Sequence, residues 1–216
     1  MRFEEAVRRL ATLPDVLPDG PEALIPVLAD TGDPRPRPSW PASDPGARPA
    51  AVLVLVFPDD LRDARLVLTE RVDRGGHHSG EVSFPGGRAE PEDADLIATA
   101  LREAREEVAL DVDAAGVRVL GMLPVQWIPV SNYSVTPVVA IAERRPRLRP
   151  QPTEVATILE PPLAAFLPSG DLTMVEREVR GWSLRYAAYR VDGLNVWGMT
   201  ARVLGGLGAW LAREDG

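Results

Sequence analysis

The residues best placed to do chemistry are three glutamates in one short charged segment, Glu103, Glu106 and Glu107. On a helix these positions are three and four residues apart, so their carboxylates project from one face. Three like charges on one face repel each other, and a cation between them turns that repulsion into chelation. Carboxylate oxygens are hard ligands that suit Mg²⁺ or Mn²⁺ rather than zinc. The spacing therefore predicts a metal-binding helical face.

An arginine and a pair of glycines lie beside the glutamates and support this interpretation. Arg102 lies four residues before Glu106, so its guanidinium can pair with that carboxylate and fix its orientation. Upstream, Gly86 and Gly87 are expected to form a turn where the backbone can approach a metal or a phosphate without obstruction by side chains. Acids, glycines and a helix start in one segment predict phosphate chemistry that uses metal ions. On an isolated helix, the same mixture of charges would indicate only a solvated face.

Strands and helices must position these residues. The continuous apolar run 51–57 predicts a buried central strand, and residues 64–71 predict the next strand. After a loop at 74–80, the Gly-Gly turn is expected to lead into a helix over 93–108, with its apolar side opposite the glutamates. Strands intermixed with covering helices predict an α/β fold with a mixed sheet. The other expected strands and helices are strands at 117–127, 134–142, 154–159, 173–179 and 182–191, and helices at 3–12, 163–167 and 198–213.

Length and composition narrow the class of protein. The 216 residues suffice for one well-buried domain with decorated ends, and the lack of cysteine excludes disulfides and thiolate chemistry. The net charge of −8 argues against a protein that binds nucleic acid through a general basic surface. No apolar run is long enough to predict a transmembrane helix, and the N-terminal residues lack the apolar core of a secretory signal. We therefore expect a cytoplasmic protein that does not bind a membrane.

The segment 87–110 resembles the Nudix box, whose pattern is Gly-x5-Glu-x7-Arg-Glu-U-x-Glu-Glu-x-Gly-U with U a bulky aliphatic residue. Residues 102–110 match its second half, with Ala109 in place of the late glycine. An acid in the middle of the motif, Asp93, and one extra residue before Arg102 resemble the coenzyme A diphosphatase branch of the family.

Other segments resemble the same branch. Residues 78–87 look like the later part of its upstream signature, although Gly75 and Gly76 depart from the pattern just before it. Segments 66–71, 129–137 and 196–202 are also similar to that branch. The resemblance implies a Nudix-type α/β/α sandwich over residues 50–213, preceded by a helical and proline-rich extension at residues 1–49.

The resemblance also implies roles for individual residues. Glu103 and Glu107 would be the main ligands of Mg²⁺ or Mn²⁺, and the Gly87 carbonyl would be an additional ligand. Glu106 would be a further ligand or the base that holds a water molecule, and Arg102 would complete the catalytic set. The substrate-binding candidates are His78, Arg71, Glu81 and Gly86.

The implied reaction is cleavage of the diphosphate bond of coenzyme A or an acyl-coenzyme A to 3′,5′-ADP and (acyl-)4′-phosphopantetheine. Trp127 and Tyr133 are then either stacking partners for an adenine or ordinary buried aromatics. The resemblance allows a homodimer. Two alternatives stay open: a Nudix hydrolase of another nucleoside diphosphate derivative, such as ADP-ribose, NADH or an oxidised nucleotide, and a non-catalytic Nudix module that senses a nucleotide. The intact set of three glutamates favours an enzyme.

Some side chains outside the helix have two interpretations that the sequence leaves open. His77 and His78 either structure their loop or contact a substrate phosphate. Glu81 either pairs with Arg102 or contributes to the metal site. Glu154 is either an ordinary charge at the edge of a strand or a general base from outside the Nudix box.

Overall fold

The computed structural model describes residues 1–33, 44–72, 81–128, 131–179 and 181–213 of the chain. In chain order, its helical elements are α1 (Phe3–Leu10), η1 (Glu22–Leu24), α2 (Leu96–Val108), α3 (Val112–Ala115), η2 (Leu163–Phe166) and α4 (Gly198–Leu211). Its strands are β1 (Val27–Leu28), β2 (Arg48–Pro58), β3 (Ala64–Leu66), β4 (Leu68–Arg71), β5 (Val82–Ser83), β6 (Gly86–Arg88), β7 (Val117–Met122), β8 (Gln126–Ile128), β9 (Tyr133–Ala142), β10 (Val155–Leu159), β11 (Leu172–Val179), β12 (Trp182–Val191) and β13 (Leu194–Val196).

The central sheet is built on β2 and β9, which run parallel from the pair Arg48–Tyr133 to the pair Val56–Ile141. Strands β3, β6, β7 and β8 pair antiparallel with these two strands, so the sheet is mixed. Strand β2 is buried from Ala50 onward, because both faces of the sheet are covered and neither can carry polar side chains. The apolar run 51–57 therefore forms the buried central strand that the sequence predicts.

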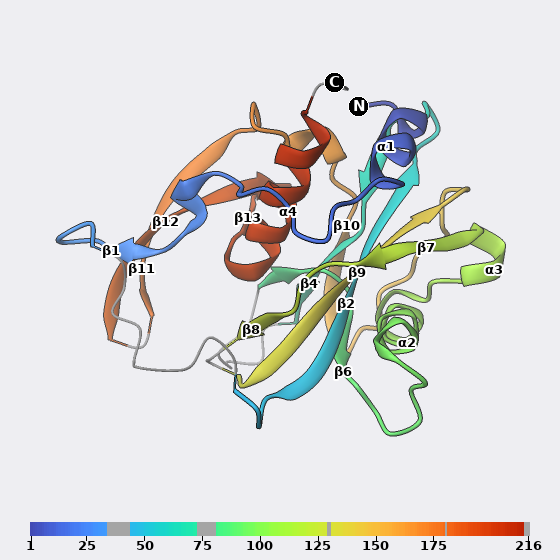
Figure 1. Cartoon of the computed structure of the whole chain (residues 1–216), viewed down its shortest axis with the longest axis horizontal. Coiled ribbons are helices and arrows are strands. Elements are labelled where there is room, and N and C mark those ends of the chain that lie inside the picture. The colour runs from blue at the N-terminus through green and yellow to red at the C-terminus, as the bar shows by residue number, and fades with distance from the viewer. Residues whose placement is uncertain (34–43, 73–80, 129–130, 180, 214–216) are drawn as a thin grey trace.

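Successive residues of β2 point to opposite faces of the sheet and enter two separate hydrophobic cores. The core on one face joins β2 to α2 through Leu53, Leu55, Phe57, Ala100, Ala104 and Val108. The core on the other face joins β2 to α1 and α4 through Val52, Val54, Val56, Leu10, Leu204 and Leu207. Figure 1 shows α2 and α4 on opposite sides of β2 and β9. The expected α/β/α sandwich with a mixed central sheet is confirmed.

A second sheet lies beyond α4 and is built around the long strand β12. Its order is β1-β12-β11, with β13 also paired to β12. Ala187 and Tyr189 of β12 belong to the same core as α4, so this helix packs between the two sheets. The strands predicted at 173–179 and 182–191 and the helix predicted at 198–213 are confirmed within a few residues.

Three predicted elements have a different form in the structure. The single strand expected at 64–71 is divided at Val67 into β3, which pairs with β2, and β4, which pairs with β10 and β5. The strand expected at 117–127 is likewise divided into β7 and β8. The helix expected at 163–167 is only the short 3₁₀ turn η2. An apolar pattern gives the inward face of a segment but does not show where the chain leaves one sheet for another.

The segment around the two glycines also differs from the prediction. Gly86 and Gly87 do not form a turn that leads directly into a helix, because they belong to β6, which pairs antiparallel with β2. A loop over 89–95 follows, and α2 begins at Leu96, three residues later than expected. Asp95 sets this start because its carboxylate accepts a hydrogen bond from the Ala98 N–H.

The described part of the N-terminal extension packs against the main fold. Phe3, Leu10 and Leu24 are buried in the core that contains α4. Strand β1 pairs with β12, so the extension also adds to the second sheet. Residues 34–43, which hold most of the expected proline-rich connector, lie outside the described residues. The division of the chain at residues 49 and 50 stays a prediction.

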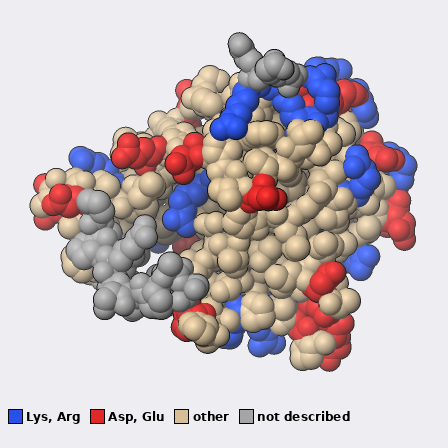
Figure 2. Space-filling model, in the orientation of Figure 1, with Lys and Arg blue, Asp and Glu red and all other residues tan. Residues whose placement is uncertain are grey.

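Charged side chains are distributed over the surface in a mixed pattern. Figure 2 shows one face of the molecule, on which acidic and basic residues are both present and lie mostly around a broad area of other residues. Over the whole chain the acidic residues outnumber the basic ones, and the net charge is −8. Within the described residues, no helix is long and apolar enough to cross a membrane.

Candidate active site

Helix α2 presents the three glutamates, and contacts at both of its ends fix its position. At the N-terminus, the Asp95 carboxylate accepts from the Ala98 N–H at 2.8 Å and satisfies a free helix donor. At the C-terminus, Ala109 adopts the left-handed conformation with a φ of 53°. This is where the Nudix box has its late glycine, and glycine takes that conformation most easily. Ala109 keeps the same helix end at some cost in backbone strain.

The three glutamates differ in how far they are removed from water. The Glu107 residue is only 4% exposed, whereas the side chains of Glu103 and Glu106 are 15% and 59% exposed. The Glu107 Oε2 atom accepts a hydrogen bond from the Gly86 N–H at 3.0 Å. Its Oε1 atom lies 3.6 Å from the Arg71 guanidinium. The sequence correctly places all three on one helix, but only Glu103 and Glu107 turn toward the sheet.

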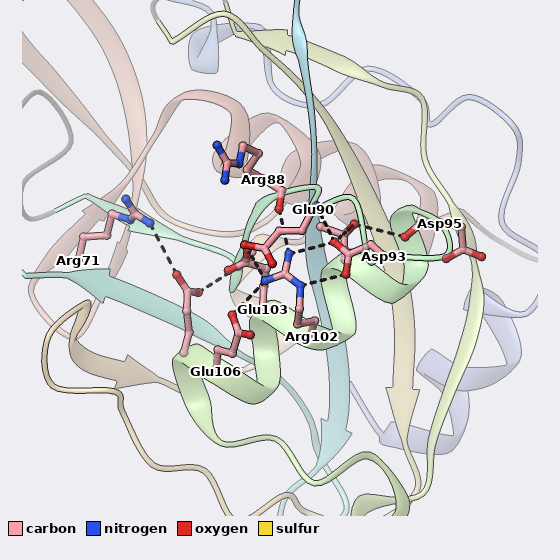
Figure 3. A network of polar contacts seen from close by, with 11 residues as sticks. Arg71, Arg88, Glu90, Asp93, Asp95, Arg102, Glu103 and Glu106 are labelled. Atoms are coloured by element: carbon pink, nitrogen blue, oxygen red, sulfur yellow. Dashed lines mark hydrogen bonds and ion pairs between the residues drawn. The ribbon is translucent and has the colours of Figure 1, made fainter.

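Arg102 organises the acids around it, as Figure 3 shows. Its Nε and Nη2 atoms donate to the two carboxylate oxygens of Asp93 at 2.9 and 3.0 Å. Its Nη1 atom donates to Glu103 and Glu106, both at 3.0 Å, and Nη2 also donates to the Arg88 carbonyl at 2.9 Å. A guanidinium has five N–H donors, and all of them are used here. The predicted pairing of Arg102 with Glu106 is confirmed.

The two adjacent glycines have different structural roles. A Cβ atom on Gly86 would overlap the backbone of Ala51 and Val52, so β6 can pair closely with β2 only without a side chain there. A Cβ atom on Gly87 would lie 2.5 to 2.7 Å from the carboxylate atoms of Glu103. The absence of a side chain at Gly87 therefore gives the Glu103 carboxylate room against the strand.

Burial and mutual repulsion raise the pKa values of the two inner acids. Burial raises the pKa of Glu107 to about 7, against the lowering effects of the Gly86 N–H and of Arg71. Burial also raises the pKa of Glu103, although Arg102 lowers it. The negative charge of Glu154, an exposed acid just before β10, also raises the pKa of both carboxyl groups, so it lies within electrostatic range of them. The site therefore carries excess negative charge that a cation would relieve.

The donor set fits a hard divalent cation. Glu103 and Glu107 supply partly desolvated carboxylate oxygens, and the missing side chain at Gly87 leaves space beside one of them. In the described parts of the chain, no three acidic or histidine side chains converge closely enough to enclose an ion as they stand. Arg102 accounts for this, because it draws Glu103 and Glu106 onto its own donors. Arg102 engages only the Oε1 atom of Glu103, so Oε2 accepts no hydrogen bond from this arginine.

The predicted substrate-binding residues divide into three groups. Arg71 and Gly86 lie at the site, because both contact the Glu107 carboxylate. Glu81 accepts the Arg71 backbone N–H at 3.1 Å through its carbonyl, and its charge raises the pKa of Tyr186. The donors of Arg102 go to other groups, so the structure does not favour the pairing of Glu81 with Arg102. His78, like His77, lies outside the described residues.

The candidate stacking aromatics are partly buried and have local partners. The Trp127 indole donates to the Asn132 side chain at 3.1 Å, and the Arg48 guanidinium lies 4.2 Å from the centre of the Tyr133 ring. Neither contact tests whether an adenine stacks there.

Arg88 is exposed and was not expected at the site; Figure 3 shows its side chain projecting away from Glu103 and Glu106. In the sequence, only the position of Arg88 next to Gly87 could have suggested that it lies near the site.

A hollow elsewhere on the surface is separate from these acids. It has a volume of about 440 Å³ and lies between β1 and the start of β12. Its lining comes from Leu28, Ala29, Asp30, Gly181, Trp182 and Ser183. None of the α2 glutamates lines it, so we assign the chemistry to the acidic face of α2.

A mixed sheet between helices, with a glycine strand set against an acid-bearing helix, defines the class of fold as Nudix. The NUDIX domain family matches residues 47–181 of the chain. The chain therefore belongs to the NUDIX family.

Two relatives from the same comparisons are named as hydrolases. The chain is 37% identical over 161 residues to "Nudix hydrolase 15, mitochondrial" of Arabidopsis thaliana, a match that covers 72% of this chain and 55% of that protein. It is 41% identical over 159 residues to "Uncharacterized Nudix hydrolase NudL" of Citrobacter koseri, covering 73% of this chain and 79% of that protein. The chain thus matches about half the length of the Arabidopsis relative. These relatives confirm the expected enzyme class, a Nudix hydrolase.

A solved structure is a more remote match. The crystal structure of the Nudix hydrolase RenU from M. smegmatis has a TM-score of 0.46 and 22% identity, and covers 60% of this chain and 82% of that chain. This level of likeness adds nothing to the family assignment.

Proposed function

We propose that this Nudix hydrolase cleaves the diphosphate bond of coenzyme A or an acyl-coenzyme A. The products are 3′,5′-ADP and 4′-phosphopantetheine or its acyl derivative. The observation that supports a diphosphatase is the buried carboxylate of Glu107. It accepts a hydrogen bond from the Gly86 N–H and lies beside Arg71, and burial raises its pKa to about 7. The choice of coenzyme A rests on the resemblance of segments 66–71, 78–87 and 196–202 to the coenzyme A diphosphatase branch.

The proposed metal ligands are Glu103 and Glu107, with the Gly87 carbonyl and Glu106 as further oxygen donors. Nudix hydrolases generally use divalent metal ions, and hard oxygen donors of this kind suit Mg²⁺ or Mn²⁺. When bound, such an ion neutralises the diphosphate and stabilises the negative charge on the departing phosphate.

The side chains of the chain itself supply orientation and proton handling. The Gly86 N–H and Arg71 hold the Glu107 carboxylate from two sides, and Arg102 holds Glu103 and Glu106 on adjacent donors. Glu106 is the most exposed of the three and can accept a proton from an attacking water molecule. Arg71 is also half-exposed, so its remaining donors can bind a diphosphate oxygen.

The reaction is a direct displacement at phosphorus. Water attacks one phosphorus of the diphosphate, the bond from that phosphorus to the bridging oxygen breaks, and the departing phosphate keeps the electron pair. Glu154 lies within electrostatic range of Glu103 and Glu107 and is the alternative acceptor of the proton from water. No covalent intermediate with the protein is required, because water is the nucleophile.

The proposal also includes the partners, the cellular location and the oligomeric state of the protein. Nudix hydrolases act on small-molecule nucleotide substrates, and we propose no nucleic-acid or membrane partner for this chain. A cytoplasmic location and a homodimer, which the resemblance allows, complete the proposal.

A substrate panel tests the proposed function. The protein is incubated with Mg²⁺ and coenzyme A, ADP-ribose, NADH or a dinucleoside polyphosphate, and the products are resolved by anion-exchange chromatography. We expect coenzyme A to give 3′,5′-ADP and 4′-phosphopantetheine, and EDTA to stop the reaction. Glu103→Gln should abolish turnover, whereas the control Glu92→Gln, the same change at an exposed loop acid, should retain it.

Two results would contradict the proposal in different ways. Rapid turnover of another panel member without turnover of coenzyme A would assign a different nucleoside diphosphate derivative as the substrate. Binding of a nucleotide without turnover of any panel member would identify a sensing module.

A further inference from the structure

Three side chains of the second sheet form a cluster that the proposed reaction does not use. The Tyr186 ring stacks on the Trp197 ring, with centroids 5.1 Å apart and planes inclined by 24°. The Arg177 guanidinium lies 5.9 Å from the centre of the Trp197 ring, and it lowers the pKa of Tyr186 against the larger raising effect of burial. Tyr186 is buried, Trp197 is half-buried and Arg177 is exposed. The aromatic pair thus holds an arginine at the surface.

Among the described residues, no ion pair joins Arg177 to an acid, and Glu81 is the acid whose charge acts on the same cluster. Arg177 pairs with Leu184 across the ladder between β11 and β12. Its neighbours Glu176 and Glu178 point to the opposite face of the sheet, because side chains alternate along a strand. A guanidinium that is already ordered loses little entropy when it binds an anion, and its planar fork matches a phosphate group.

The cluster adjoins the candidate active site through two neighbouring strands. Arg71 at the end of β4 contacts Glu107 and donates its backbone N–H to the Glu81 carbonyl. The negative charge of Glu81 acts on Tyr186, and β13, which ends just before Trp197, packs against β5. The chain of neighbours from Arg71 to the cluster therefore runs through the pairing of β4 with β5, the contact of β5 with β13 and the pairing of β13 with β12.

We propose that Arg177 binds a phosphomonoester of the substrate that is separate from the reacting diphosphate. Arg177 then selects nucleotides that carry an additional phosphate, which in coenzyme A is the 3′-phosphate of the ribose. ADP-ribose and NADH lack this group and leave the guanidinium unpaired. The inference rests on the proposed function in one respect, namely that the reacting diphosphate lies at Glu103 and Glu107.

Tyr186 and Trp197 act on the substrate only through Arg177. The Trp197 ring supports the guanidinium by a cation–π contact, and Tyr186 holds the Trp197 ring by stacking on it. They are positioning residues, so Tyr186→Phe, which keeps the stacked ring, should weaken the preference for the additional phosphate less than the loss of Arg177 does.

Binding of two small nucleotides tests the proposal without turnover. Isothermal titration calorimetry compares 3′,5′-ADP with 5′-AMP, which differ only in the 3′-phosphate. We expect the wild-type chain to bind 3′,5′-ADP at least about tenfold more tightly, equivalent to about 1.4 kcal/mol. Arg177→Met should bring the two affinities to within about twofold of each other, and Arg177→Lys should retain part of the preference.

The matched control is Arg185→Met, which removes the same charge on the adjacent strand. Arg185 pairs with Glu176 across the ladder and so lies on the opposite face from Arg177. This variant should keep the wild-type ratio of affinities. The proposal is contradicted if the wild-type chain shows no preference for 3′,5′-ADP, or if Arg177→Met leaves that preference unchanged.

The proposed function can fail independently of this inference. Coenzyme A turnover is measured separately on the wild-type chain, and its absence contradicts the proposed function. The ratio of affinities needs no turnover, so it still decides the role of Arg177.

Discussion

At the scale of single residues, Glu107 combines burial with negative charge. The Gly86 N–H and Arg71 only partly compensate for lost hydration, so the pKa of this carboxyl is raised to about 7. In the folded chain, Glu107 therefore binds a proton between its ordinary pKa of 4.5 and about 7, whereas the unfolded chain releases it. Because the folded state binds more protons in this window, the free energy of unfolding falls as the pH rises.

We predict that this pH dependence becomes weaker in Glu107→Gln. In EDTA, raising the pH from 4.5 to 7 should reduce the stability of the wild-type chain by up to about 3 kcal/mol more than that of the variant. Glutamine keeps the shape of the side chain and still accepts the Gly86 hydrogen bond, but it does not titrate. Urea unfolding at several pH values measures the difference. Parallel stability profiles for the two proteins would show that Glu107 is not desolvated as described.

Arg102 gives a second prediction at this scale. Arg102→Met removes the donors that hold Asp93, Glu103 and Glu106, and leaves three acids close together without a counter-charge. We expect a loss of about 3 kcal/mol in the free energy of unfolding. The control Arg105→Met, at an exposed arginine of the same helix, should change it by less than about 0.5 kcal/mol. Equal losses in the two variants would contradict the organising role of Arg102.

At the scale of elements, the short strand β6 connects the central sheet to α2. It pairs with β2 on one side and lies against Glu103 and Glu107 on the other. Its two glycines are indistinguishable in the sequence, but one serves the strand pairing and the other serves the carboxylate.

We predict that substituting each glycine by alanine distinguishes the role of Gly86 in strand pairing from the role of Gly87 beside the Glu103 carboxylate. Gly86→Ala places a methyl group against the backbone of β2 and should lower the melting temperature strongly. Gly87→Ala displaces the Glu103 carboxylate and should lower the hydrolysis rate with a smaller loss of stability, because that side chain can move. Gly121→Ala is the control, since a Cβ atom there meets nothing within 4 Å. Similar stability losses at both glycines would contradict this division.

The sequence predicts which segments form strands and helices better than it predicts where each of them begins and ends. A continuous apolar run identified β2, and apolar residues at helical spacing identified α2 and α4, because burial against a sheet imposes these patterns. The bend at Val67 and the pairing of Gly86 with Val52 depend on tertiary contacts that no local pattern carries. The three glutamates were found from their spacing together with the glycine pair that precedes them, because the spacing alone would also fit a solvated face.

Other parts of the site come together only through the fold. For Glu154 the sequence leaves two interpretations open, and its effect on the pKa values of Glu103 and Glu107 favours a place near the site. The Arg177 cluster has no local signal in the sequence, because it is assembled from separate strands.

At the scale of the whole molecule, the N-terminal residues complete the core on the side of α4. Leu10 is 1% exposed among residues of α4 and of the central sheet. We predict that Leu10→Ala lowers the free energy of unfolding by about 2 to 4 kcal/mol through the cavity it leaves. Val16→Ala, at a position that is 71% exposed, should cost less than about 0.5 kcal/mol. If Leu10→Ala were equally harmless, the extension would not be part of the folding unit.

The central claim is that the acidic face of α2 carries a metal-dependent diphosphatase. Its most direct test is the rate of coenzyme A hydrolysis at saturating Mg²⁺, measured side by side for the wild-type chain and Glu107→Gln. We predict that the wild-type chain releases 3′,5′-ADP and that the variant, with its fold intact by circular dichroism, is slower by on the order of 1,000-fold or more. Equal rates in the two proteins would contradict the account.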